Sequence, residues 1–230
     1  MYTKLIITND KVTYRLTSEL LDEKYYAEAA GFIQKLFKIE NEIVIPVKNS
    51  RSPANRRSFC PIIFGHINIA RLDNRYSEII IHETIHYLCK NKVLPKVLTL
   101  WAARTADITF LLLKLLREGK SSEEFHYFPF WYDQDFPRRK KLYFESGFRY
   151  YNFKKTDNNT RAYRPIVEAF NKMQARKFVF KEEYELGAFV AGIIKGILDD
   201  TGSIDRVSGF LQELIIRTPL EEAVCNVLVI

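Results

Sequence analysis

The chain has 230 residues and a mass of 27.1 kDa, enough for one large domain or two small ones with a substantial core. Hydrophobic residues make up 47%, aromatic residues 14% and charged residues 27%, a balance that excludes a disordered tail, a collagen-like fibre and a heptad rod. The formal net charge of +7 indicates only a mild preference for anionic partners.

Strand patterns occupy the first third of the chain. Residues 2–8 and 11–16 alternate β-branched and aromatic side chains around Asn9-Asp10, which predicts a hairpin. A helix is predicted over residues 22–38 and a buried strand over residues 42–48, EIVIPVK, in which Pro46 indicates an edge or an end. Residues 61–71, PIIFGHINIAR, predict a further strand interrupted at Gly65.

From Ser77 onward the hydrophobic period changes from two to about 3.6 residues, which is typical of helices. We predict helices over residues 77–90, 95–118, 137–151, 164–176, 181–199, 203–217 and 220–228. Strands followed by helices indicate an α+β fold, with a small N-terminal mixed sheet and a mainly helical C-terminal half. We expect a mostly β subdomain with one helix over residues 1–76 and a helical subdomain over residues 77–230, forming one compact catalytic domain.

Cysteine usage and hydropathy bear on the compartment. Cys60, Cys89 and Cys225 are far apart and odd in number, which argues for a reducing compartment and against a disulfide framework. The first ten residues lack the pattern of a secretory signal. No window reaches the roughly 20 clean apolar residues of a membrane span. We therefore expect a soluble, cytoplasmic protein.

The most informative stretch is EIIIHETIHYLCK, which contains the H-E-x-x-H pattern as His82, Glu83 and His86. On a helix, positions i and i+4 share a face, so both imidazoles can bind one ion. Glu83 lies about 100° around the helix from His82, where a general base can reach a water molecule beside the metal. The alternative is a pair of core histidines that meets the pattern by accident.

A catalytic zinc site needs a third protein ligand. Cys89 and Lys92 exclude the extended H-E-x-x-H-x-x-G-x-x-H form, so the third ligand must lie elsewhere. We favour Glu145, a carboxylate in the aromatic and buried pattern LYFESGFRYY. Asp107 is second, but for this residue we favour an ion pair with Arg104 or Lys114 on a solvated face. All candidates are Asp107, Glu118, Glu123, Glu124, His126 and Glu145.

Three blocks in the same order resemble the gluzincin zinc metallopeptidases, the aminopeptidase-N-like and peptidase-MA-like group. HETIH is similar to their zinc-binding helix, FESGFRYY resembles their N-E-G-F-A-x-Y block, and YELGA at residues 184–188 resembles their Y-E-x-G-A block. The resemblance covers roughly residues 30 to 225. It implies a zincin-like fold and a Zn²⁺ cofactor with His82, His86 and Glu145 as ligands. It also implies that Tyr184 hydrogen-bonds the tetrahedral oxyanion.

The sequence departs from that family in three places. Residues 91–137 form a long insertion that could be a lid or a packed wall, and in FESGFRYY a serine separates Glu145 from Gly147. The G-A-M-E-N block that holds a free amino terminus is absent, and FGHINIAR stands in its place. An endopeptidase is therefore favoured over an aminopeptidase. In the family this strand pairs with substrate, which makes the candidate substrate-binding residues Gly65, His66, Ile67 and Asn68.

The resemblance implies hydrolysis of a peptide or protein substrate through a zinc-bound water activated by Glu83. Two other hypotheses remain. The run RRKK at residues 138–141 could make the chain a non-catalytic basic module, but no nucleic-acid-binding motif accompanies it. The chain could also be a metallopeptidase-like scaffold that is inactive until a partner arrives.

Overall fold

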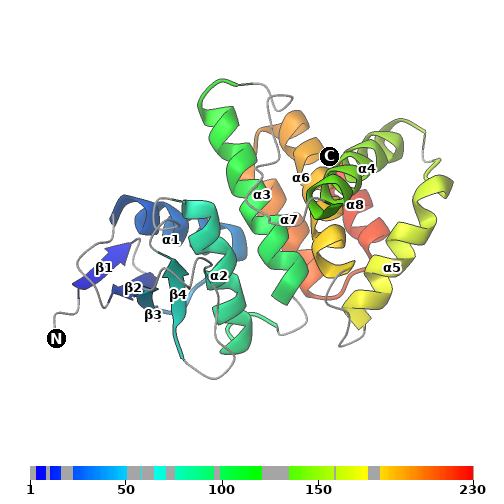
Figure 1. Ribbon diagram of the computed structural model, residues 1–230. Helices are drawn as coiled ribbons and strands as arrows, with labels where there is room; N and C mark the ends of the chain where they lie inside the picture. Colours follow the sequence, from blue (N-terminus) through cyan, green and yellow to red (C-terminus); the bar gives the residue numbers. More distant parts are fainter. Residues whose placement is uncertain are drawn as a thin grey trace. The chain divides into compact units, whose positions relative to one another are not determined.

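The structure is a computed structural model that describes residues 4–8, 11–16, 23–50, 58, 65–70, 76–95, 99–120, 135–157, 159–175 and 182–229. The described residues form an α+β fold that is mostly helical, which confirms the expected class. The chain divides into two compact units, Met1–Thr99 and Leu100–Ile230. In Figure 1 the first unit runs from blue to teal and the second from green to red.

The first unit contains a four-stranded sheet in the order β1-β2-β3-β4. Strands β1 (Lys4–Thr8) and β2 (Val12–Leu16) pair antiparallel, which confirms the predicted hairpin. Strand β3 (Ile43–Ser50) runs parallel to β2, and β4 (Ile67–Ala70) runs parallel to β3. The sheet is therefore mixed, as the sequence pattern predicts.

Alternation along the strands buries one face of the sheet. Side chains at every second position are fully buried, namely Val12, Tyr14, Leu16, Ile45, Val47, Ile67 and Ile69, while Arg15, Val44 and Lys48 between them are exposed. Pro46 pairs with Arg15 in β2, and the ladder with β4 begins only at Val47. The proline thus lies where β3 has one described neighbour, which suits a residue without a backbone N–H.

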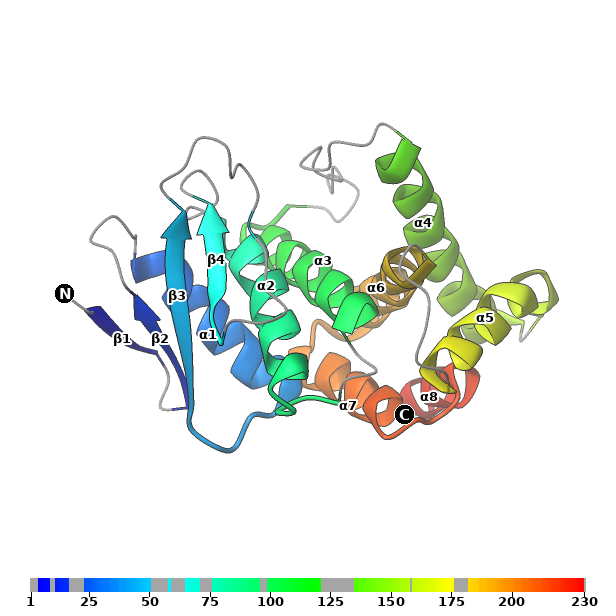
Figure 2. The same cartoon turned by 60° about the horizontal axis from the view of Figure 1, so that its bottom comes forward.

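Two helices pack on the buried side of the sheet. Helix α1 (Glu23–Phe37) lies against β1 and β2, and α2 (Ser77–Lys90) lies against both α1 and β4 (Figure 2). We expected a division between residues 76 and 77, but α2 belongs to the first unit. The reason is that its buried face packs on α1 and β4, so the division falls between Thr99 and Leu100.

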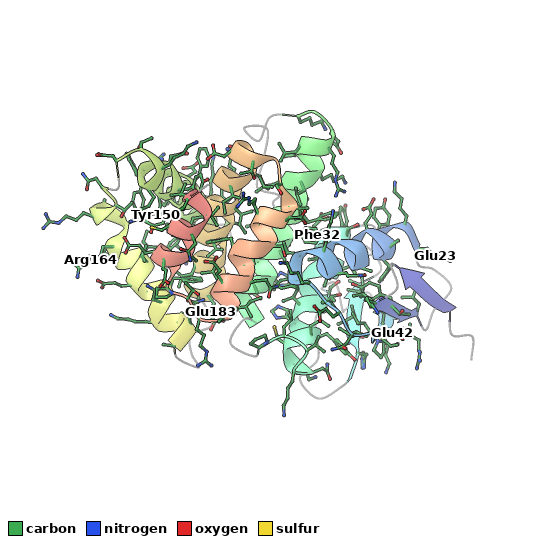
Figure 3. All side chains as sticks on the ribbon, turned by 180° about the vertical axis from the view of Figure 1, so that it is seen from behind. Glu23, Phe32, Glu42, Tyr150, Arg164 and Glu183 are labelled. Atoms are coloured by element: carbon green, nitrogen blue, oxygen red, sulfur yellow. The ribbon has the colours of Figure 1, made fainter. Side chains whose placement is uncertain are left out.

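The second unit is helical throughout its described residues. Figure 3 labels the first residue of α5, Arg164, and the second of α6, Glu183. The elements are α3 (Thr99–Arg117), α4 (Asp135–Thr156), the short 3₁₀ turn Arg161–Tyr163, α5 (Arg164–Ala175), α6 (Glu182–Thr201), α7 (Ile204–Ile215) and α8 (Leu220–Leu228). No helix among the described residues is long and apolar enough to cross a membrane.

Helices α4 and α6 run in the same direction and cross at very short range. A Cβ at Gly147 on α4 would collide with the backbone carbonyl of Phe189 on α6, and one at Gly192 on α6 would collide with that of Phe144 on α4. Further along α6, a Cβ at Gly196 would collide with the ring of Tyr151 on α4. Glycines are required at positions 147 and 192 because a side chain there would separate the two backbones.

Candidate metal centre

Helix α2 forms because apolar residues recur on one side of Ser77–Lys90. Ile80, Ile81, Ile85 and Leu88 are each 0% exposed and pack into the first unit. The helix ends after Lys90, where Asn91 donates from Nδ2 to the carbonyl of Tyr87 at 2.9 Å. Its buried face is therefore fixed by the apolar pattern, and the remaining face carries the histidines.

Polar contacts on the buried side also hold α2. Ser77 Oγ donates to Glu28 Oε2 of α1 at 2.8 Å. The hydroxyls of Thr84 and Tyr14, the latter on β2, share a hydrogen bond of 2.8 Å, and both residues are 0% exposed. Both contacts tie the helix to elements far away in sequence, so they resist rotation of α2 about its axis.

His82 and His86 converge on one point. Their Nε2 atoms are 3.1 Å apart, and their ring centroids are separated by 4.7 Å with the planes at 78°. Two zinc–nitrogen bonds of 2.0–2.1 Å at a tetrahedral angle would separate the nitrogens by about 3.3 Å. The two imidazoles therefore fit a shared zinc ion with little adjustment.

The same 3.1 Å is a hydrogen-bond distance, so in the metal-free chain one ring can donate its N–H to the other. This contact accounts for the two histidines as core residues and also holds them in the orientation that a metal needs. His82 and Glu83 are only 5% and 8% exposed, and His86 is half-buried. The motif thus lies at the margin of the core.

Strand β4 lies next to this helix. In the described part of the sheet β4 is an edge, because β3 is its one neighbour. Gly65 and His66 precede the strand, and Ile67 and Asn68 begin it; residues 61–64 and 71 of the predicted strand lie outside the described residues. Ile67 is buried and the side chain of Asn68 is half-buried.

His66 has a distinct electrostatic environment. Burial and the nearby ammonium groups of Lys48 and Lys90 lower the pKa of His66 below its ordinary 6.5. Its imidazole is therefore neutral at physiological pH. Because Lys90 is the last residue of α2, the start of β4 lies near the end of the helix that carries the two histidines.

Glu145 lies on α4 in the second unit, and it is not buried as the aromatic pattern led us to expect. Its side chain is 39% exposed, with Lys141 Nζ and Arg149 Nη2 each 3.9 Å from the carboxylate. The helical period turns Phe144 and Tyr150 inward and Glu145 outward. The carboxylate is consequently accessible, with one basic residue a turn before it and one a turn after it.

Tyr184 lies near the start of α6, half-buried, with the Arg104 guanidinium carbon 5.1 Å from its ring centroid. The next residue, Glu185, contacts Arg139 at 3.5 Å, which joins the N-terminal parts of α6 and α4. The second unit thus brings the elements bearing Glu145 and Tyr184 side by side. His82, Glu83 and His86 all belong to the first unit.

The other third-ligand candidates have different environments. Asp107 Oδ2 accepts a hydrogen bond from Arg104 Nη1 at 2.7 Å, and both side chains are buried, so the pair lies in the core and not on the solvated face we considered. Glu118 is exposed and pairs with Lys120 at 2.7 Å. Glu123, Glu124 and His126 lie outside the described residues.

The glycines in the two weaker sequence blocks have a packing role. Gly147 allows α4 to meet α6, and a Cβ at Gly187 would lie 2.6 Å from the carbonyl oxygen of Trp101 on α3. Residues 101–110 of α3 are all buried, so this part of the helix lies in the core. These glycines are explained by the crossings of α3, α4 and α6 alone, so the resemblance of these two blocks depends on Glu145 and Tyr184.

Sequence reasoning missed two contacts, the Tyr14–Thr84 hydrogen bond and the stacking of Arg104 on Tyr184. Within the described ranges, no cluster of three or more potential metal-binding side chains (His, Cys, Asp or Glu) is formed. Comparisons with protein-family models, curated proteins and solved structures find no match to this chain.

Proposed function

We propose that the chain is a zinc-dependent metallopeptidase of zincin-like fold that acts as an endopeptidase. The observation that carries the proposal is the convergence of His82 Nε2 and His86 Nε2 to 3.1 Å, on a helix where Glu83 lies between them in sequence. Two imidazoles and an adjacent carboxylate are the donor set and the base that zinc hydrolases use.

The position of β4 supports a peptide substrate. An extended peptide can add to a sheet edge through its backbone, and β4 is the described edge strand against which α2 packs. A peptide held along Ile67–Ala70 would therefore lie beside the helix that carries His82 and His86. Side-chain selectivity would come from the residues next to that strand.

His82, His86 and Glu145 are the residues that would hold the ion, the carboxylate on the strength of the resemblance of FESGFRYY to the family's block. Bound zinc would act as a Lewis acid that lowers the pKa of a water molecule toward about 7. The accessible carboxylate of Glu145 suits this role better than Asp107, whose carboxylate is already paired with Arg104 in the core.

Glu83 is the general base of the proposed reaction. It takes a proton from the attacking water and returns it to the leaving amine as the peptide bond breaks. The side chain of Tyr184 donates a hydrogen bond to the oxyanion that develops on the carbonyl, a contribution of about 2–4 kcal/mol. Arg104, stacked on the ring of Tyr184 and paired with Asp107, restricts where that hydroxyl can point.

The surroundings of β4 favour endopeptidase over aminopeptidase activity. An aminopeptidase must hold a free ammonium group, and residues 65–70, GHINIA, contain no acidic side chain. The ammonium groups of Lys48 and Lys90 are near enough to His66 to lower its pKa. Two positive charges at the start of the strand would repel a substrate amino terminus.

The test is the substitution Glu83→Gln, which removes the base and keeps the shape of the side chain. We expect zinc content to remain and peptide cleavage, measured on a fluorogenic peptide library, to fall by about 10²–10⁴-fold. Glu78→Gln, on the first turn of the same helix, is the matched control and should retain both. Cleavage at the wild-type rate by Glu83→Gln would refute the proposed mechanism.

A further inference from the structure

The buried hydroxyl pair behind the motif has no part in the proposed reaction. Tyr14 on β2 and Thr84 on α2 are both 0% exposed, and their oxygens are 2.8 Å apart. The Tyr14 ring packs edge-on against Tyr26 of α1, with centroids 5.2 Å apart and planes at 71°. Tyr14 is thus held by the sheet and by α1, and its hydroxyl is a fixed point against which α2 can be oriented.

Thr84 lies within the HETIH sequence itself, on the opposite side of the helix from the histidines. With about 100° per residue, it is about 200° around from His82 and about 160° from His86. A bond on that side resists rotation of α2 about its axis, the motion that would carry both imidazoles away together. Metal and catalytic sites tolerate errors of only about 0.5 Å and 10–20°.

We propose that Tyr14 is a positioning residue that orients His82 and His86 through its hydrogen bond to Thr84. The inference deepens the proposed function where it concerns metal binding, and it concerns the metal-free chain as well. Burial raises the pKa of the Tyr14 hydroxyl, so the hydroxyl keeps its proton throughout the physiological range. The contact is therefore present whatever the pH at which the site operates.

The first experiment measures zinc affinity of the full chain by competition with a chromophoric chelator. Tyr14→Phe and Thr84→Val each remove one hydroxyl and keep the shape of the side chain, and we expect each to weaken zinc binding about three- to tenfold. The double variant should lose no more than the weaker-binding single variant, because both act through one bond. Additive losses would contradict a role of Tyr14 through Thr84.

The matched control is Tyr151→Phe in the second unit. It also removes one phenol hydroxyl, which donates to Asp200 at 2.9 Å, but it lies on α4 rather than behind the motif. Zinc affinity should be unchanged in this variant. An equal loss in Tyr151→Phe would mean that general destabilisation lowers the affinity, and it would overturn the inference.

A second readout needs no metal. ¹⁵N NMR of the metal-free protein reports the hydrogen bond between the Nε2 atoms of His82 and His86. We expect Tyr14→Phe to weaken that bond and Tyr151→Phe to leave it unchanged. If the wild-type chain binds no zinc, the proposed function fails, and these spectra alone decide the positioning role. Unchanged imidazole signals in Tyr14→Phe would overturn it.

Discussion

Replacing Gly147 by alanine places a methyl group against the backbone of Phe189, where α4 and α6 cross. The new Cβ would lie 2.8 Å from the Phe189 carbonyl carbon and closer still to its oxygen, whereas real Cβ contacts below 3.0 Å essentially never occur. Because the obstacle is backbone, the helices must separate. Overpacking of this kind lowers the free energy of unfolding by up to about 3 kcal/mol. The higher helix propensity of alanine raises it by about 1 kcal/mol.

The net expectation for Gly147→Ala is a loss of about 2 kcal/mol in the free energy of unfolding. The matched control is Gly209→Ala on α7, where a Cβ would meet nothing within 4 Å. That variant should gain about 0.5–1 kcal/mol. Urea denaturation followed by tryptophan fluorescence measures both, because the buried Trp101 packs on Phe170 in this unit. A Gly147→Ala variant as stable as the wild type would refute the packing account of this glycine.

Two further predictions concern the candidate site. Tyr184→Phe should lower kcat about 30- to 10³-fold with KM little changed, because the lost hydrogen bond forms only in the transition state; an effect on KM alone would assign Tyr184 to substrate packing. His66 has a folded-state pKa below 6.5, so as the pH falls below 6.5 the unfolded chain binds the proton first and the folded state loses stability. Between pH 7.5 and 5.5, His66→Gln should therefore lose less stability in urea denaturation than the wild type, and equal losses would contradict the depressed pKa.

Local patterns were sufficient to predict most of the helices. The predicted ranges 77–90 and 220–228 coincide with α2 and α8. Both segments carry their apolar residues at helical spacing and have a residue that favours a helix boundary at one end, Asn91 after α2 and Pro219 before α8. The hairpin of β1 and β2 was also predictable from local patterns, because its two strands are adjacent in sequence.

Contacts between distant segments were not predictable from local patterns. Tyr14 and Thr84 are 70 positions apart, and no period in the sequence relates β2 to α2. An aromatic run around Glu145 led us to expect a buried carboxylate, but which side of α4 is buried depends on its crossing with α6 at Gly147. The burial of Asp107 likewise follows from α3 packing inside the second unit.

The histidine pair lies between these two cases. The i, i+4 spacing of His82 and His86 predicts a shared face from the helical period alone. Their 3.1 Å separation, in contrast, requires a particular side-chain orientation of both rings. Sequence therefore identified the pair, and the structure supplied the distance that can be compared with zinc coordination.

The most direct test of the central claim is zinc content by mass spectrometry on the full chain after reconstitution and desalting. The wild type should hold about one zinc per chain, and His86→Ala and Glu145→Ala should each lose most of it, because each removes one of three protein ligands. Zinc retained in Glu145→Ala alone would assign the third ligand to another residue. Zinc retained in His86→Ala, or none in the wild type, would contradict a metal site at HETIH.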